Sequence, residues 1–164
     1  MEPVPAGDRS GAPGGPSLTD DLPRSVVRTG LGLFLLFAGI SHFVATDAFR
    51  AQVPPWMPAP DLVIWVRGVV EVLLGLGLLF LPVRHRPLVG WLTAAFLVAV
   101  FPGNVSQWVT GTDAFGLDSD RARGLRLLFQ PLLVVAALWS TRAWSTWRAT
   151  RRDAGRAVRP RARR

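Results

Sequence analysis

Apolar residues occur in four long blocks along this chain, and shorter polar or proline-rich stretches separate the blocks. A soluble domain spaces its apolar residues at helical or strand periodicity. Blocks of about 20 apolar residues are instead typical of helices that cross a hydrocarbon core of roughly 30 Å. The pattern therefore predicts an all-α integral membrane protein, a four-helix bundle. The predicted spans are residues 25–44, 62–81, 88–109 and 123–143.

Segments of different composition flank the four blocks. Residues 1–24 are rich in Pro, Gly and Asp and have little to bury, so we expect a disordered N-terminal segment. Residues 25–143 form the predicted transmembrane domain, and the stretch 45–61 within it contains the run VPPWMPAP, which favours an ordered interfacial loop. The first block is long and no A-x-A-like site follows it, so we interpret it as a retained span and not as a signal peptide.

The arginines are distributed unevenly between the two sides of the predicted bundle. The chain carries nineteen basic residues, all of them arginine, and a formal charge of +8. If the N-terminus is inside, fourteen arginines fall on the cytoplasmic side, three in outer loops and two within spans. Cytoplasmic loops carry an excess of basic residues, so both termini are predicted to be cytoplasmic.

The Arg-rich tail, residues 144–164, follows directly after the fourth span. From Trp147 onwards no further aromatic residue is interleaved for base stacking, and we expect no nucleic-acid partner. Close to the membrane surface, each basic residue gains about 1 kcal/mol from anionic lipids. The tail is therefore predicted to contact anionic lipids and to anchor the topology.

Two ionisable residues interrupt the second predicted span. Arg67 and Glu71 stand four residues apart and share one helix face. A charge near the bilayer centre costs on the order of 2.5–3.5 kcal/mol, so this face is expected to be buried in the bundle. Gly68 and Gly75 lie on the same side and would let another helix pack closely. The pair is either functional or a structural ion pair that holds two helices in register.

The other three spans also carry polar side chains, and the predicted topology places all of them in the outer half. Short loops make the helices neighbours, so these side chains can converge. We expect a polar intramembrane site, either ligand-binding or structural, that is formed by His42, Arg67, Glu71, Asn104, Arg126 and Gln130.

Structural alternatives exist for each of these residues. His42 could be a core hydrogen-bonding residue, Asn104 could satisfy carbonyls freed by Pro102, and Arg126 could extend its head group to the interface. Small residues at four-residue spacing in the third span favour a further helix-packing face, made of Ala95, Ala99 and Gly103.

The candidate chemistry is limited by the residues that the chain contains. It has no cysteine, which excludes disulfides, thiol redox chemistry and Cys-ligated clusters. His42 and His85 are predicted on opposite sides of the membrane, so we expect neither a metal site nor a haem with two histidine ligands. We assign no catalytic residue. The spans hold one arginine more than glutamate, so either Arg126 reaches water or an outer-loop aspartate (Asp47, Asp61 or Asp120), or the site accommodates an anion or polar head group. His42 beside Glu71 would suit quinone or proton chemistry.

Several motifs follow one another along the spans: Gly39-x-x-His42-Phe43, the loop VPPWMPAPDLV, Gly68-x-x-Glu71-x-x-x-Gly75, Phe101-Pro102-Gly103-Asn104 and Arg126-x-x-x-Gln130-Pro131. In this order they resemble the DoxX-like family of small four-helix bacterial membrane proteins. The resemblance covers about Val26 to Trp144. It implies the fold, residence in a bacterial cytoplasmic membrane, and a link to membrane redox or stress-response systems.

Three functional hypotheses follow from the sequence. The first is an accessory subunit that supports a redox enzyme partner and touches quinone or a small substrate at the outer polar site. The second is a structural or interaction protein whose buried polar groups lock helix packing, and the third is a small-solute transporter. An autonomous enzyme is the least favoured class. The sequence specifies neither a ligand nor an oligomeric state.

Overall fold

The computed structural model describes residues 18–50, 53–54, 56–111 and 119–157. Within these ranges the chain is helical and contains no strand. Four of the described helices are long and apolar enough to cross a membrane: α1 (Leu18–Val44), α3 (Pro60–Phe80), α4 (Arg86–Thr110) and α5 (Asp120–Ser140). The shorter elements are α2 (Thr46–Arg50), the single 3-10 turn η1 (Val83–His85) and α6 (Ala143–Ala157).

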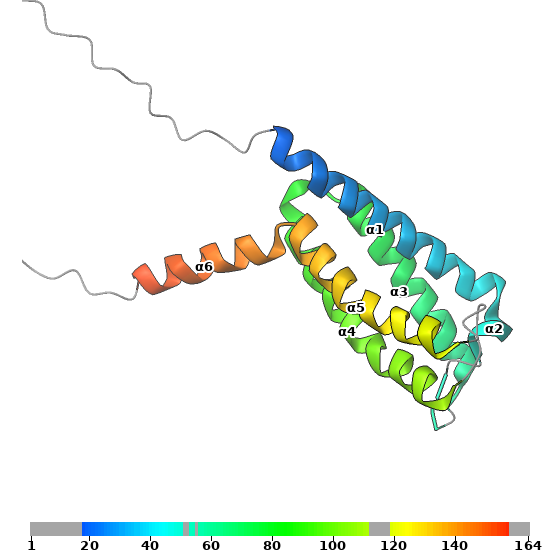
Figure 1. The fold of residues 1–164 in the computed structure, drawn as a ribbon. Helices are drawn as coiled ribbons and strands as arrows, with labels where there is room; N and C mark the ends of the chain where they lie inside the picture. The colour runs from blue at the N-terminus through cyan, green and yellow to red at the C-terminus, as the bar shows by residue number, and fades with distance from the viewer. Residues whose placement is uncertain (1–17, 51–52, 55, 112–118, 158–164) are drawn as a thin grey trace, which may run out of the picture.

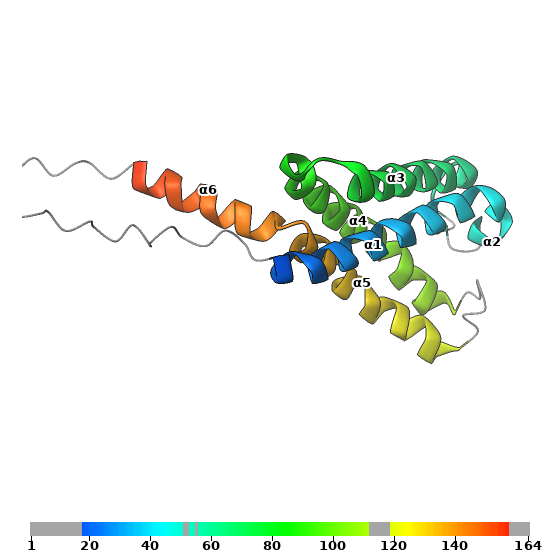
Figure 2. The same ribbon diagram turned by 90° about the horizontal axis from the view of Figure 1, so that it is seen from above.

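The four long helices form a bundle in which sequential neighbours run antiparallel (Figure 1, Figure 2). Helix α1 packs against α3, α3 against α4, α4 against α5 and α5 against α1, so each long helix has two neighbours. Four traverses return the chain to its starting end, where α1 begins and α5 ends. Helix α6 projects away from this end of the bundle, and α2 lies at the opposite end (Figure 1).

Large apolar side chains cover the outward faces of the long helices. Phe37, Phe80 and Leu132, for example, are more than half exposed. The largest contiguous group of buried apolar side chains lies inside the bundle and consists of Leu31, Leu35, Leu74, Leu78, Val89 and Ala137. Soluble monomers rarely expose apolar patches of this extent, whereas outward apolar faces are what a bilayer covers. The distribution is that of a multi-pass membrane protein in contact with lipid.

Helix α1 begins earlier than the sequence pattern predicts. Residues 1–17 of the predicted disordered segment lie outside the described residues, but residues 18–24 are helical, so the prediction is wrong for this part. The reason lies in tertiary contacts. Asp21 forms an ion pair with Arg142, and the Arg24 guanidinium lies 5.4 Å from the ring centroid of Trp139. These contacts hold the start of α1 against the end of α5. They also offset the hydrogen bond that is lost because Pro23 has no backbone N–H.

The segments outside the spans contain more helix than the pattern predicts. Within the predicted interfacial loop, residues 46–50 form α2, although the described residues between α2 and α3 have no regular structure. The fourth long helix ends at Ser140 and not at residue 143, because Arg142 adopts a left-handed conformation with φ of 58°. Helix α6 then occupies much of the Arg-rich tail, and residues 158–164 lie outside the described residues.

Candidate functional site

Helices α1 and α3 touch backbone to backbone through glycines. A Cβ atom at Gly39 would lie 2.8 Å from the carbonyl oxygen of Gly68, and one at Gly75 would lie 2.8 Å from that of Gly32. A real side chain does not tolerate such distances to backbone atoms, so glycine permits the approach. Gly68 and Gly75 therefore lie where α1 comes closest to α3. This contact sets the separation across which the polar side chains meet.

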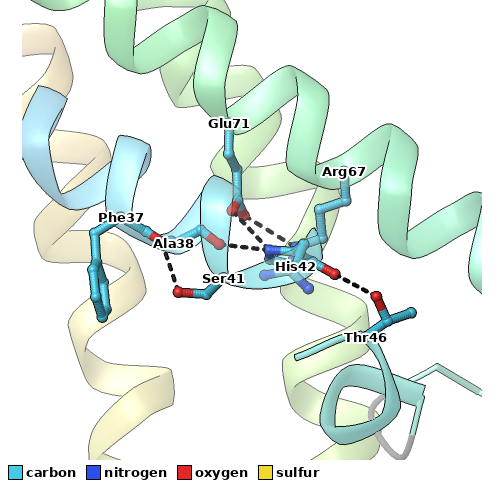
Figure 3. Close-up of polar contacts among 7 residues, drawn as sticks. All are labelled: Phe37, Ala38, Ser41, His42, Thr46, Arg67 and Glu71. Atoms are coloured by element: carbon cyan, nitrogen blue, oxygen red, sulfur yellow. Dashed lines mark hydrogen bonds and ion pairs between the residues drawn. The ribbon is translucent and has the colours of Figure 1, made fainter. Parts of the chain in front are cut away.

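His42 on α1 meets two ionisable residues of α3 beside the glycine contact (Figure 3). Glu71 Oε2 lies 3.3 Å from His42 Nδ1, and Arg67 Nε lies 3.1 Å from Glu71 Oε1. His42 and Glu71 are 2% and 4% exposed, whereas the Arg67 side chain is 24% exposed. A buried carboxylate between an imidazole and a guanidinium thus joins the two helices.

The hydrogen bonds of His42 determine which ring nitrogen carries the proton. Nδ1 lies 2.7 Å from the carbonyl oxygen of Ala38, which can only accept, so Nδ1 is the donor. In the neutral ring Nε2 is then a bare acceptor, and it makes no hydrogen bond within the described residues. Glu71 Oε2 also lacks a hydrogen bond there. Two buried acceptor atoms are therefore left over at one place, although such atoms are normally satisfied.

Helix α2 closes this end of the bundle over His42. The Phe49 ring stacks on the imidazole with 3.8 Å between ring centroids, and Thr46 Oγ1 donates to the His42 carbonyl over 2.9 Å. Arg50 forms two hydrogen bonds with Asp61 at the start of α3, of 2.5 and 2.6 Å, and this pairing raises the pKa of Arg50. Sequence reasoning missed Phe49, because an aromatic residue in a short segment carries little signal by itself.

Helices α4 and α5 contribute a second polar set, whose members bond mainly to each other. Asn104 Nδ2 donates to Gln130 Oε1 over 2.8 Å, and Gln130 Nε2 donates to the carbonyl oxygen of Leu97. Arg126 Nη1 donates to Gln107 Oε1 over 2.8 Å. The Asn104 amide therefore links two helices, and in this respect differs from the backbone-satisfying role considered from the sequence.

Residues of both polar sets line one cavity of about 390 Å³. Its wall includes all six residues that the sequence predicts to converge, and they come from all four long helices: His42, Arg67, Glu71, Asn104, Arg126 and Gln130. The remaining wall is apolar and includes Phe34, Phe129 and Leu133. Apolar walls with a few convergent polar groups are the usual form of a small-molecule site.

A second, larger cavity of about 620 Å³ adjoins the first. The two cavities share His42, Phe49 and Arg67 in their walls. Trp56 and Met57 from the proline-rich stretch line the second cavity, together with residues of α3 and α4. The polar cluster thus lies between the cavity inside the bundle and the larger cavity beneath the connection from α2 to α3.

The predicted packing face of the third span is wrong. Ala95 and Ala99 are exposed, and a Cβ atom at Gly103 would have no other atom within 4 Å. Helix α4 instead packs tightly at Gly90, where an added Cβ would lie 1.9 Å from Thr141 Oγ1. The spacing of small residues predicts that α4 has a close-packing face. It does not tell the face with Gly103 from the face with Gly90, because that depends on which other helix lies against each face.

Metal ligands do not gather in the part of the chain that the structure describes. No group of three or more His, Cys, Asp or Glu side chains there could hold a metal ion. His42 and Glu71 form a pair, which is fewer than the three or four protein ligands of typical zinc sites.

Comparison with known proteins places the chain in a family but does not identify an activity. A family model described as "Domain of unknown function (DUF8561)" matches residues 31–141, which contain all six cavity residues named above. No curated protein and no solved structure matches the chain. The resemblance to the DoxX-like family stays a prediction. Since the matched region makes up more than half of the sequence, the chain belongs to the DUF8561 family.

Proposed function

We propose that this protein is a multi-pass protein of the bacterial cytoplasmic membrane with both termini in the cytoplasm. The four long apolar helices and their exposed apolar faces support insertion. The start of α1, η1 and α6 lie at one end of the bundle (Figure 1), and the arginines concentrate in these segments. An excess of arginine favours the cytoplasmic side.

Single-cysteine labelling tests this orientation directly, because the natural chain contains no cysteine. Asp47→Cys lies on α2 and Arg84→Cys on η1, at opposite ends of the bundle, and both positions are exposed. In intact cells, a membrane-impermeant maleimide is expected to label Asp47→Cys, and Arg84→Cys only after the membrane is broken. The reverse pattern would overturn the proposed orientation.

For the function itself, we propose that the polar cavity binds the head group of a membrane quinol. The protein would then act as an accessory component of a membrane redox or stress-response system, as the DoxX-like resemblance implies. The observation that carries this proposal is the pair of buried acceptors, His42 Nε2 and Glu71 Oε2, which have no hydrogen bond within the described residues. Both residues line the cavity of about 390 Å³.

The chemistry of a quinol complements these atoms. A quinol hydroxyl donates a hydrogen bond, and an unsatisfied buried acceptor gains most from such a donor. The aromatic ring of the head group suits the apolar wall formed by Phe34, Phe129 and Leu133. An oxidised quinone presents carbonyl acceptors only and cannot donate to His42 Nε2 or Glu71 Oε2. We therefore expect the reduced form to bind about tenfold more tightly, which corresponds to roughly 1.4 kcal/mol.

Binding of a short-chain benzoquinol and a short-chain naphthoquinol to the purified protein in nanodiscs tests this proposal. Glu71→Gln retains the shape of the side chain but replaces one oxygen by a donor, so quinol affinity is expected to fall about tenfold. Thr93→Val is the matched control, since Thr93 is fully buried, its Oγ1 also lacks a hydrogen bond in the described residues, and it does not line the cavity. Equal binding by wild type and Glu71→Gln would contradict the proposal.

A structural role is the second candidate, and the α4–α5 set favours it. The side chains of Asn104, Gln107, Arg126 and Gln130 bond to one another or to backbone, so they lock α4 to α5 without a ligand. If quinol binding is absent and changes at His42 and Glu71 lower only the amount of folded protein, the whole cluster serves packing.

A further inference from the structure

Another cavity, lined by several arginines, lies at the opposite end of the bundle from the polar site. It measures about 360 Å³ and is enclosed by the starts of α1 and α4 and by the junction of α5 with α6. Its described lining contains Arg24, Arg28, Arg86 and Arg142 but a single acidic residue, Asp21. The cavity thus has a surplus of three positive charges, and the proposed quinol site does not use any of these residues.

The fold builds this pocket from segments that are distant in sequence. Gly90 lets α4 pack against Thr141, since any side chain there would collide with Thr141 Oγ1. Arg86 lies one turn before Gly90 on α4, so this close packing brings Arg86 to the end of α5. The left-handed Arg142, with φ of 58°, turns the chain into α6 and lies against Asp21 of α1. The arginines are therefore gathered by packing and not by their order in the chain.

Protein partners satisfy these arginines only in part. Arg28 is 7% exposed and donates to the carbonyl of Leu78, and Arg142 pairs with Asp21. In contrast, Arg24 Nε, Arg86 Nε and Ser140 Oγ are buried atoms without a hydrogen-bond partner in the described residues. Ser140 itself is 5% exposed, and all three residues line the cavity. Like charges close together, with donor atoms that water does not reach, are costly unless an anion joins them.

We infer that this pocket binds the phosphate group of an acidic phospholipid. Guanidinium groups match phosphate oxygens with paired N–H donors, and the Ser140 hydroxyl adds a further donor. Helix α4 begins beside the pocket with Arg86, and His85 at the N-cap position makes no side-chain capping bond, so the positive end of the helix dipole also favours an anion. The pocket lies at the ends of long apolar helices, the level at which lipid phosphates are found.

This site differs from a general attraction between the Arg-rich tail and lipid. On α6, Arg148 and Arg151 are exposed and stack over Trp144 and Trp147, with 5.2 and 4.4 Å from guanidinium carbon to ring centroid. Neither arginine lines the pocket. Removing two charges from the tail therefore serves as a matched control for removing two charges from the pocket.

The test uses the full-length protein in detergent and native mass spectrometry with phosphatidylglycerol or phosphatidylcholine of identical acyl chains. Arg24→Gln/Arg86→Gln is expected to weaken phosphatidylglycerol binding about tenfold. Arg148→Gln/Arg151→Gln is expected to weaken it by less than about twofold, because a detergent micelle lacks the anionic surface that attracts the tail to a bilayer. Wild type is expected to prefer phosphatidylglycerol to phosphatidylcholine. A further arm adds inorganic phosphate, which shares the chemistry but lacks acyl chains and is expected not to displace the lipid at equal concentration.

If the pocket and tail variants lose phosphatidylglycerol affinity equally, the inference is overturned, because the lipid is then held by a general attraction to basic residues. Equal binding of the two lipids, or displacement by inorganic phosphate at equal concentration, would likewise overturn a lipid site. Circular dichroism and size-exclusion chromatography check that each variant folds. Should the double pocket variant not fold, Arg142→Gly decides. It removes a pocket guanidinium at a position where glycine suits the backbone, and unchanged phosphatidylglycerol affinity would then reject the site.

Discussion

His42 Nδ1 and Glu71 Oε2 lie 3.3 Å apart, and Gly68 makes this contact possible. A Cβ atom at Gly68 would lie 2.9 Å from His42 Cβ, so the base of the His42 side chain occupies the space that a larger residue on α3 would fill. The same backbone contact thus serves helix packing and brings the candidate proton-accepting groups together. Changes at the glycines and at the polar residues are consequently expected to affect each other.

Removing Arg67 alone is expected to cost more than removing Arg67 and Glu71 together. Arg67→Ala leaves the buried Glu71 without its guanidinium, at a cost of about 3–5 kcal/mol. Glu71→Ala is expected to cost less, since Arg67 is 24% exposed and can reach water. The double variant should recover part of the loss. Folded abundance in native membranes measures the effect, and additive losses would show that the two residues do not stabilise each other.

Gly39→Ala and Gly30→Ala are expected to have opposite effects on stability, although both lie on α1. A Cβ at Gly39 would lie 2.8 Å from the Gly68 carbonyl oxygen and 2.9 Å from Val72 N, and these backbone atoms cannot move independently. We expect a loss of about 1–3 kcal/mol. At Gly30 no atom lies within 4 Å, so Ala should be neutral or add up to about 1 kcal/mol through helix propensity. Thermal unfolding in detergent distinguishes the two.

The amide pair of α4 and α5 should show coupling in a double-mutant cycle. Gln130→Leu strands the buried Asn104 amide and frees the Leu97 carbonyl, which is expected to cost about 2 kcal/mol. Asn104→Leu/Gln130→Leu removes the stranded amide and should cost less than the sum of the single changes. Chemical denaturation of the purified protein provides the four free energies, and a sum equal to the double variant would argue against the hydrogen bond.

The backbone of Arg142 predicts an unusual order of stability among its variants. Both Arg142→Gly and Arg142→Ala lose the ion pair with Asp21, but only Ala must adopt the left-handed conformation with a side chain. The Gly variant is therefore expected to be more stable by about 1 kcal/mol. Thermal midpoints of the two proteins measure this difference. If Ala proves the more stable, the turn between α5 and α6 does not depend on a positive φ.

Much of the architecture could be predicted from the sequence. In lipid a chain must satisfy its own backbone hydrogen bonds, so an apolar block of about 20 residues has few choices other than a helix. The long helices accordingly begin and end close to the predicted limits, except at Leu18, Asp120 and Ser140. The order of the spans also places His42, Glu71 and Asn104 toward the same end of the bundle, whichever way the helices are rotated.

In contrast, the rotation of each helix about its own axis and the contacts between helix ends follow from tertiary packing and cannot be deduced from the sequence. Small residues lie on more than one side of α4, and Gly90 packs while Gly103 does not, because Thr141 is the neighbour that comes close. The stacking of Phe49 on His42 and the gathering of arginines around Ser140 likewise depend on where helix ends meet. Periodicity reports which residues share a face of their own helix. Which face turns inward depends on the sum of contacts with the other helices, and those contacts exist only in the folded bundle.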